Sequence, residues 1–334
     1  MNRFCLSILL VLASLPSLFK SCTPDANTFV NRGVVLARKG QYDKAIIQFD
    51  KALSIDPQST HALMWRGHAW HCMGQYDKAI TDCNAALRLA PDSAVPYLAR
   101  GHVWFEKGEY DKALDDCDAA LRLDPKAAHA YEGRAAVWER KGDFDKALAE
   151  MEHALQINPT ATTAYITRAR AWYEKGDYDN ALANCNACLG LDPKAAYAYV
   201  GRSRVWSKMG RYEKALADCN AAMQIAPKEA SVYRWLAWLQ ATCPDKNYRD
   251  GNKALGNAKH AYDLSGRKNW VFCEALAAAY AEAENFSKAC EWQSKAVTLA
   301  TADKVPTAKE RKEARLRLEL YKAKKPYRDE QKQR

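Results

Sequence analysis

The sequence predicts an all-α fold in which antiparallel helix pairs stack into a solenoid. A proline recurs at a constant step of 34 residues along most of the chain. Each step contains two segments whose apolar residues recur at helical spacing. One amphipathic helix pair cannot bury both of its faces, whereas a stack of pairs can, which explains the repetition. The recurring prolines are Pro57, Pro91, Pro125, Pro159, Pro193 and Pro227.

Residues 1–25 precede the repeats and predict an export signal. Arg3 lies before the apolar run CLSILLVLASLPSLF, which is too short to span a bilayer and is followed by small residues. We therefore expect an exported protein of the periplasm or cell envelope. A lipoprotein signal, with membrane attachment through Cys22, is the alternative, although Phe19 and Lys20 fit a lipid-attachment sequence poorly.

Six regular units follow without a gap, at 26–59, 60–93, 94–127, 128–161, 162–195 and 196–229. In the third unit, Tyr97, Gly101 and Trp104 recur at i, i+4 and i+7 and predict a first helix over 94–108. Ala113, Cys117 and Ala120 predict a second helix over 109–123 in the same way.

Glycine and aspartate mark the expected helix ends of this unit. Gly108 follows the first helix, where a left-handed residue is favoured. Asp111 falls in the first turn of the second helix, where the helix dipole favours an acid. We expect Asp124 to cap the next helix, with Pro125 at its first position.

The 34-residue period, with a small residue at position 8, a large one at 11, alanine at 20 and proline at 32, resembles the tetratricopeptide repeat (TPR). This resemblance implies a right-handed superhelical solenoid whose concave groove receives a protein segment. Position 8 holds Gly33, Gly67, Gly101, Ala135, Ala169 and Ser203. Position 20 holds Ala45, Ala79, Ala113, Ala147, Ala181 and Ala215.

Position 7 is arginine in all six units, and position 23 is polar or acidic. We predict a structural ladder of arginine–carboxylate contacts, exemplified by Arg100 and Asp116, with the arginine stems lying on tryptophan. Position 11 is tryptophan in five consecutive units, and we expect these residues to be structural. They are Trp70, Trp104, Trp138, Trp172 and Trp206.

The pattern becomes less regular after Pro227. Residues 230–265 predict a degenerate unit with a long turn between its helices, and 266–300 a divergent terminal unit. Residues 301–334 predict a capping helix and a basic tail, because terminal repeats need a polar outer face. Three segments together resemble a C-terminal module of bacterial TPR proteins, which adds no activity: LQATCPD at 239–245, AAAYAEA at 277–283 and LELYKAKKPYR at 318–328.

In the resemblance to the TPR family, positions 2, 5, 9, 12 and 13 of each first helix face the groove. We expect a non-catalytic scaffold that binds a protein or peptide through this face, since aromatic and arginine side chains are typical anchors for a partner. The predicted binding residues are His68, His71, His102, Phe105, Arg170, Tyr173, Arg204, Arg234 and Trp238.

The alternative function is binding of an anionic surface or polymer through the tail, because +6 of the +10 net charge lies in residues 301–334. The body is only mildly basic, so we expect no specific nucleic-acid partner.

No enzyme signature is present: a nucleophile elbow, an HExxH motif and a phosphate-binding glycine loop are all missing. We expect no cofactor and no metal, because no cysteine is phased to join the clustered histidines. A pH-responsive patch is favoured over a metal site, since histidine titrates near neutral pH. Cys185 and Cys188 form a CxxC in core positions of a helix, which favours a structural role over a redox one.

Overall fold

The computed structural model describes residues 25–266, 269–302 and 306–329 and shows only helices and turns in these ranges. The chain divides into two compact units, at Pro159 and Thr160. The predicted export signal and Cys22 lie outside the described residues and stay predictions. None of the described helices is both long and apolar enough to cross a membrane.

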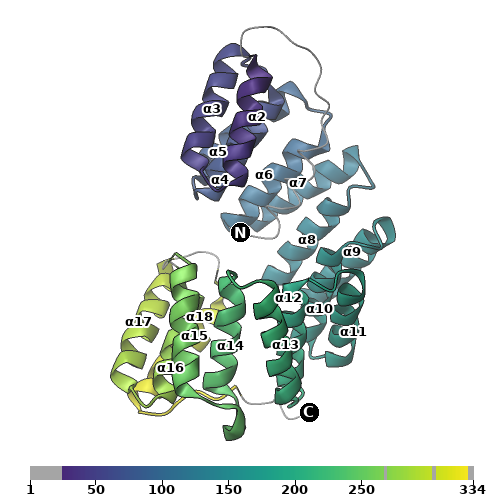
Figure 1. Cartoon of the computed structure of the whole chain (residues 1–334). Helices are drawn as coiled ribbons and strands as arrows, with labels where there is room; N and C mark the ends of the chain where they lie inside the picture. The colour runs from purple at the N-terminus through teal and green to yellow at the C-terminus, as the bar shows by residue number, and fades with distance from the viewer. Residues whose placement is uncertain (1–24, 267–268, 303–305, 330–334) are drawn as a thin grey trace. The chain divides into compact units, whose positions relative to one another are not determined.

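Unit 1 contains four antiparallel helix pairs that pack in sequence order (Figure 1). Each predicted pair is present, so the all-α prediction is confirmed here. The helices are α2 (Ala26–Arg38), α3 (Tyr42–Ile55), α4 (Thr60–Cys72), α5 (Tyr76–Leu89), α6 (Ala94–Glu106), α7 (Tyr110–Leu123), α8 (Ala128–Lys141) and α9 (Phe144–Ile157).

Within unit 2, consecutive helices pack in the same way, and the last helix, α18, packs against α17. The expected long turn is present between α14 and α15 and contains a short 3₁₀ helix, η1. The elements are α10 (Thr162–Lys175), α11 (Tyr178–Leu191), α12 (Ala196–Lys208), α13 (Tyr212–Ile225), α14 (Ala230–Thr242), η1 (Lys246–Tyr248), α15 (Gly251–Leu264), α16 (Trp270–Glu282), α17 (Phe286–Ala302) and α18 (Ala308–Lys322).

Two of the residues predicted to mark helix ends in the third repeat unit lie where they were expected. Gly108 follows α6 with φ of 81°, and Asp111 lies in the first turn of α7. The predictions that Asp124 caps the next helix and that Pro125 is its first residue are wrong, because Asp124 is the C-terminal cap of α7 and α8 begins only at Ala128. The residue before a proline is driven to extended backbone, and the Asp124 carboxylate accepts a bond from the Lys126 amide instead.

Small residues allow the two helices of a pair to approach closely. In unit 1 the position-20 alanines are fully buried, and Cys117 is 4% exposed. A Cβ atom at Gly101 would lie 3.2 Å from the Asp116 Cβ atom, and one at Gly133 would lie only 2.9 Å from Cys117 Sγ. The buried cysteine therefore fills the space left by a glycine on α8.

Replacing Gly133 with alanine should destabilise unit 1 by about 1 kcal/mol, because crowding of the sulfur outweighs the helical preference of alanine. In a Cys117→Ala background the same change should stabilise by about 0.5–1 kcal/mol, since the sulfur is gone. Chemical denaturation of the four proteins measures this cycle. An equal effect of Gly133→Ala in both backgrounds would contradict the packing described.

The arginine ladder is present and extends further than expected. Arg100 donates to Asp116 from Nε at 2.9 Å and from Nη2 at 2.6 Å, and its Nη1 reaches Asn84 on the preceding pair at 2.6 Å. Each such arginine therefore joins its own pair to the one before it. The same double contact occurs at Arg66 (Asp82, Asp50), Arg134 (Glu150, Asp118) and Arg202 (Asp218, Asn186).

The expectation that the arginine stems lie on tryptophan is wrong. The Arg100 guanidinium lies 5.7 Å from the Tyr97 ring, one helical turn before it, because residues three apart share a helix face. Four of the five tryptophans are instead covered by a lysine of the second helix, as Lys112 covers Trp104 at 4.6 Å. Trp172 is covered by Lys175 of its own helix, at 5.3 Å. All five position-11 tryptophans are half-buried, as a structural role requires.

Candidate functional site

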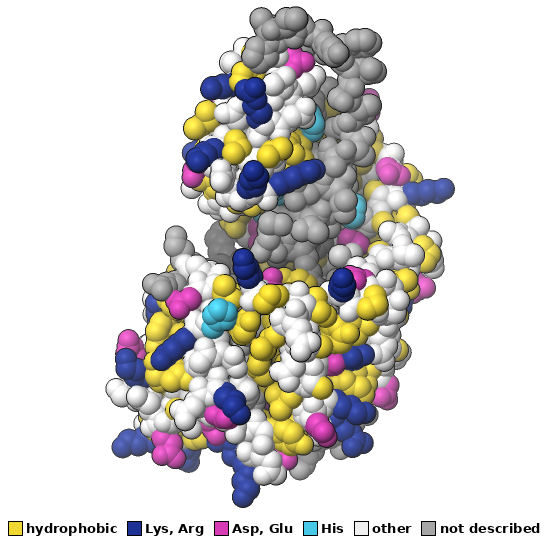
Figure 2. Space-filling view, viewed as in Figure 1, with side chains coloured by type: hydrophobic (Ala, Val, Ile, Leu, Met, Phe, Trp, Pro, Cys, Tyr) yellow, Lys and Arg dark blue, Asp and Glu magenta, His cyan; other side chains and the backbone are white. Residues whose placement is uncertain are grey.

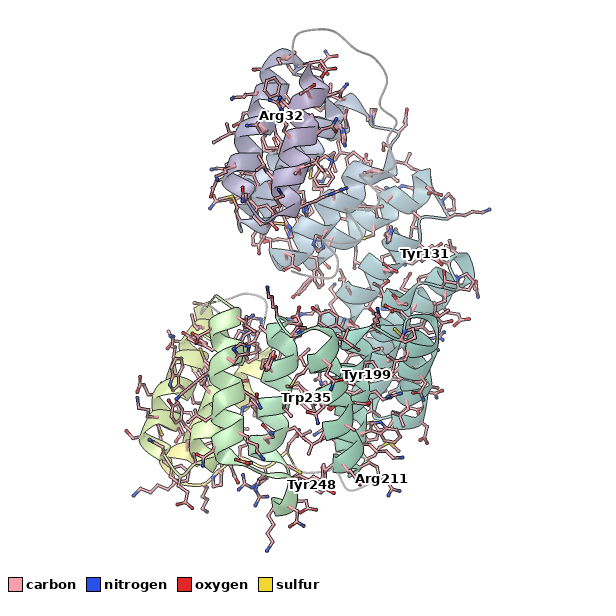
Figure 3. All side chains as sticks on the ribbon, in the orientation of Figure 1. Arg32, Tyr131, Tyr199, Arg211, Trp235 and Tyr248 are labelled. Carbon is pink, nitrogen blue, oxygen red and sulfur yellow. The ribbon has the colours of Figure 1, made fainter. Side chains whose placement is uncertain are left out.

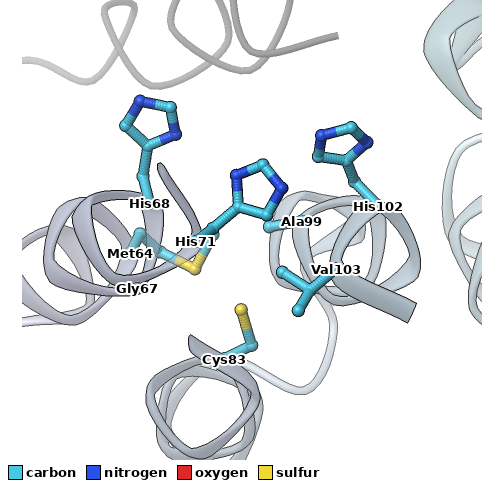
Figure 4. Close-up of a pocket in the computed structure, with 8 residues that line it drawn as sticks. All are labelled: Met64, Gly67, His68, His71, Cys83, Ala99, His102 and Val103. Atoms are coloured by element: carbon cyan, nitrogen blue, oxygen red, sulfur yellow. The ribbon is translucent and has the colours of Figure 1, made fainter. Parts of the chain in front are cut away.

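The predicted binding residues of unit 1 form a compact histidine cluster rather than an open surface. His68, His71 and His102 are only 8%, 9% and 7% exposed. The His71 and His102 rings lie 4.8 Å apart between centroids, which brings α4 and α6 together (Figure 4). Phe105 is half-buried and packs against Tyr110.

Five of the predicted residues lie on unit 2 helices α10, α12 and α14, and three of these, Tyr173, Arg204 and Arg234, come together. The Arg204 guanidinium lies 5.2 Å from the Tyr173 ring and 5.5 Å from the Trp235 ring. Trp235 is held in place because its indole N–H donates to Ser203 at 2.8 Å (labelled in Figure 3). Arg234 precedes Trp235 on α14 and is close enough to Arg204 for their charges to repel.

The two arginines form a site of uncompensated positive charge. Among the described residues, Arg204 Nε is buried without a hydrogen-bond partner, and no carboxylate lies within ion-pair distance of either guanidinium. Burial, and then the charge of Arg204, lower the pKa of Arg234 to about 10. Glu274 is the carboxylate that opposes this shift, and it is already bound to Arg317. An anionic group placed between the arginines would satisfy both.

The described part of the C-terminal tail lies along the same helices. Lys208 on α12 binds the Asp329 carboxylate at 2.5 Å, and the Asp329 amide donates to the Thr242 carbonyl at 2.9 Å. The Trp238 ring lies 5.7 Å from the Tyr327 ring. The predicted site residue Trp238 therefore contacts the tail, whereas Arg170 on α10 is exposed.

The CxxC thiols indicate no redox site, and the described surface charges on one face form no patch of a single sign (Figure 2). On the face shown in Figure 2, Lys and Arg are interspersed with Asp and Glu among the described side chains. Cys185 and Cys188 of the CxxC are both buried in α11, and burial raises the pKa of Cys185 to about 12. A thiol with that pKa stays protonated at neutral pH, which agrees with the structural interpretation.

Sequence reasoning missed three residues of the unit 2 site: Trp235, Tyr327 and Asp329. Trp235 falls outside the expected groove positions, and only its aromatic character beside Arg234 could have indicated it. The tail residues are separated from their contacts by up to 121 residues, so no local pattern predicts their position.

The fold and the site define a helical-repeat protein whose unit 2 carries a cationic, aromatic face. Models of the tetratricopeptide repeat match residues 26–59, 60–93, 101–172 and 173–239. The chain belongs to the tetratricopeptide repeat family, whose members are generally non-catalytic scaffolds that bind protein partners. Comparison with curated proteins gives no match.

Solved structures show the same fold. A tetratricopeptide repeat protein from Parabacteroides merdae aligns over 76% of this chain and 98% of its own, at 20% identity and a TM-score of 0.61. The human IFIT1 dimer with m7Gppp-AAAA aligns over 89% of this chain and 77% of its own, at 16% identity and 0.59. The APC/C hetero-tetramer Cut9-Hcn1 aligns over 69% of this chain and 45% of its own, at 20% identity and 0.57.

Proposed function

We propose that the protein is a non-catalytic scaffold that binds an acidic protein segment on the face of unit 2 formed by α10, α12 and α14. The observation that carries the proposal is the Arg204–Arg234 pair, which lies beside the Tyr173 and Trp235 rings and has no carboxylate partner among the described residues. We name this set the arginine site: Tyr173, Arg204, Arg234 and Trp235.

The arginine site suits a carboxylate in a peptide. Arginine binds carboxylates through paired N–H donors, and partial burial strengthens that contact because less water competes. Aromatic side chains beside the arginines offer apolar area at a small cost in side-chain entropy, as binding anchors do. The helices are already in place, so the partner bears most of the ordering cost.

The tail supports this choice of partner. Its Asp329 binds Lys208 with its carboxylate, its backbone amide bonds to α14, and its Tyr327 ring packs on Trp238. An acidic residue two positions after an aromatic one is thus accommodated beside the arginine site by the chain itself. A partner segment with similar chemistry would use the same kinds of contact.

The test is selection of a random 12-residue peptide library on the full-length protein. We expect enrichment of peptides that carry Asp or Glu near an aromatic residue. The double variant Arg204→Gln/Arg234→Gln should bind the selected peptides about 10- to 100-fold more weakly, because hydrogen bonds to charged groups contribute about 1.5–3 kcal/mol. Fluorescence anisotropy with labelled peptides measures the affinities.

Arg211→Gln is the matched control, because it removes one arginine charge from an exposed position of unit 2. Its affinity should equal that of the wild type. Unchanged binding by the double variant would contradict the proposal. A second experiment uses a truncated protein that lacks residues 326–334. This protein should bind the selected peptides as well as the wild type or more tightly. Complete loss of peptide binding would instead indicate that the tail is the binding element.

A further inference from the structure

Three potential metal ligands lie together at the end of α4 in unit 1. The side-chain ligand atoms of His68, His71 and Cys72 lie within 4.8 Å of one another. Residues three and four apart share one face of a helix, which explains why the sequence HAWHC brings them together. The expectation that no cysteine is phased to join the histidines is therefore wrong: Cys72 ends the same helix as His68 and His71.

The spacing of the Cys72 and His68 ligand atoms matches tetrahedral metal coordination. Cys72 Sγ lies 3.6 Å from His68 Nε2. With zinc–sulfur and zinc–nitrogen bonds of about 2.3 and 2.0–2.1 Å, a tetrahedral angle separates the two ligand atoms by about 3.5–3.6 Å. These two side chains thus already stand at the distance that one shared zinc ion requires.

A fourth ligand is available from the next helix pair. His102 on α6 lies with its ring centroid 4.8 Å from that of His71, and both rings lie on the same side of the two helices (Figure 4). The His102 side chain is only 7% exposed, so little water competes for its ring nitrogens.

The surroundings favour a transition metal over magnesium or calcium. Beside the three histidines, the pocket is lined by Met64, Gly67, Cys83, Ala99 and Val103, and this lining contains no carboxylate. Hard cations prefer oxygen ligands, whereas imidazole and thiolate suit zinc and similar metals. The three histidines are each less than a tenth exposed, which limits competition from water.

We propose that His68, His71, Cys72 and His102 bind one Zn²⁺ ion and thereby link the helix pairs α4/α5 and α6/α7. On binding, the Cys72 thiol releases one proton to solvent and coordinates as the thiolate, while the three imidazoles coordinate as neutral rings. All four positions are filled by protein, which is the arrangement of a structural site and not of a catalytic one. The site is independent of the arginine site in unit 2.

Cobalt(II) is the spectroscopic probe for this site in the full-length, metal-stripped protein. We expect one Co²⁺ per chain, with the intense visible bands of tetrahedral coordination and a thiolate-to-cobalt charge-transfer band in the near ultraviolet. Added Zn²⁺ should remove both sets of bands by displacement. Absence of Co²⁺ and Zn²⁺ binding by the folded wild type overturns the proposal.

Variants assign the ligands. Cys72→Ser should abolish the charge-transfer band, and His102→Asn should weaken Co²⁺ binding at least about tenfold, as loss of a ligand does. Cys290→Ser and His260→Asn are the controls, because they alter the same residue types in unit 2. Circular dichroism shows whether each variant is folded. A charge-transfer band that survives in folded Cys72→Ser overturns the assignment.

Discussion

Replacing Arg317 with alanine is expected to destabilise unit 2 by about 3–5 kcal/mol, because it leaves a buried carboxylate without its partner. Arg317 and Glu274 are both 6% exposed, and Arg317 Nη2 lies 2.7 Å from Glu274 Oε1. Gln293, which is fully buried, donates to Glu274 at 3.2 Å and to the Ala314 carbonyl at 2.9 Å. The network joins α16, α17 and the capping helix α18.

Urea denaturation of the full chain measures this effect, and hydrogen exchange shows whether α18 opens first. Arg315→Ala is the matched control, because Arg315 is exposed on the same helix. The double variant Arg317→Met/Glu274→Leu should recover most of the lost stability, since it removes both charges. If Arg317→Ala lowers the free energy of unfolding no more than Arg315→Ala does, the network does not hold the capping helix α18 in place.

The second large effect is expected at the arginine ladder of unit 1. Arg100→Ala should destabilise this unit by about 2–3 kcal/mol at pH 7, because the 4%-exposed Asp116 loses two hydrogen bonds from a charged donor. The contact to Asn84 on the preceding helix pair is lost as well. Denaturation of unit 1 measures the change, with Arg122→Ala on the exposed side of α7 as the control.

The pH dependence of this variant follows from Asp116. Burial raises the pKa of Asp116, and the bonds and charge of Arg100 oppose that rise. Without Arg100 the folded-state pKa rises further, so the protonated carboxyl is favoured in the folded protein. A raised folded pKa contributes stability at low pH that is lost as pH increases through it. The destabilisation should therefore be smaller at pH 4 than at pH 7, and a pH-independent difference would contradict the role given to Asp116.

The fold could be predicted from the sequence because the decisive signals are local and repeated. The 34-residue step, Gly108 after its helix and the alanines at position 20 each act within one helix pair. The pairing of Arg100 with Asp116 was also predictable, since both positions recur in every unit. The arginine contacts to the preceding pair were not predicted, because they depend on how neighbouring pairs pack.

The candidate sites were predicted less completely. Arg204 and Arg234 were identified from their repeat positions, but the role of Trp235 depends on the geometry between α12 and α14. Cys72 was overlooked although it shares a helix with His68 and His71. The docking of Asp329 on Lys208 joins segments 121 residues apart, and only the tertiary structure defines such a contact.

Hydrogen exchange of the full-length protein with and without a selected acidic peptide tests the proposed function most directly. We expect the peptide to slow amide hydrogen exchange in α12 and α14, which carry Arg204 and Arg234. In the Arg204→Gln/Arg234→Gln variant the peptide should not change the exchange rates of these helices. Protection confined to unit 1 or to the C-terminal tail would contradict it.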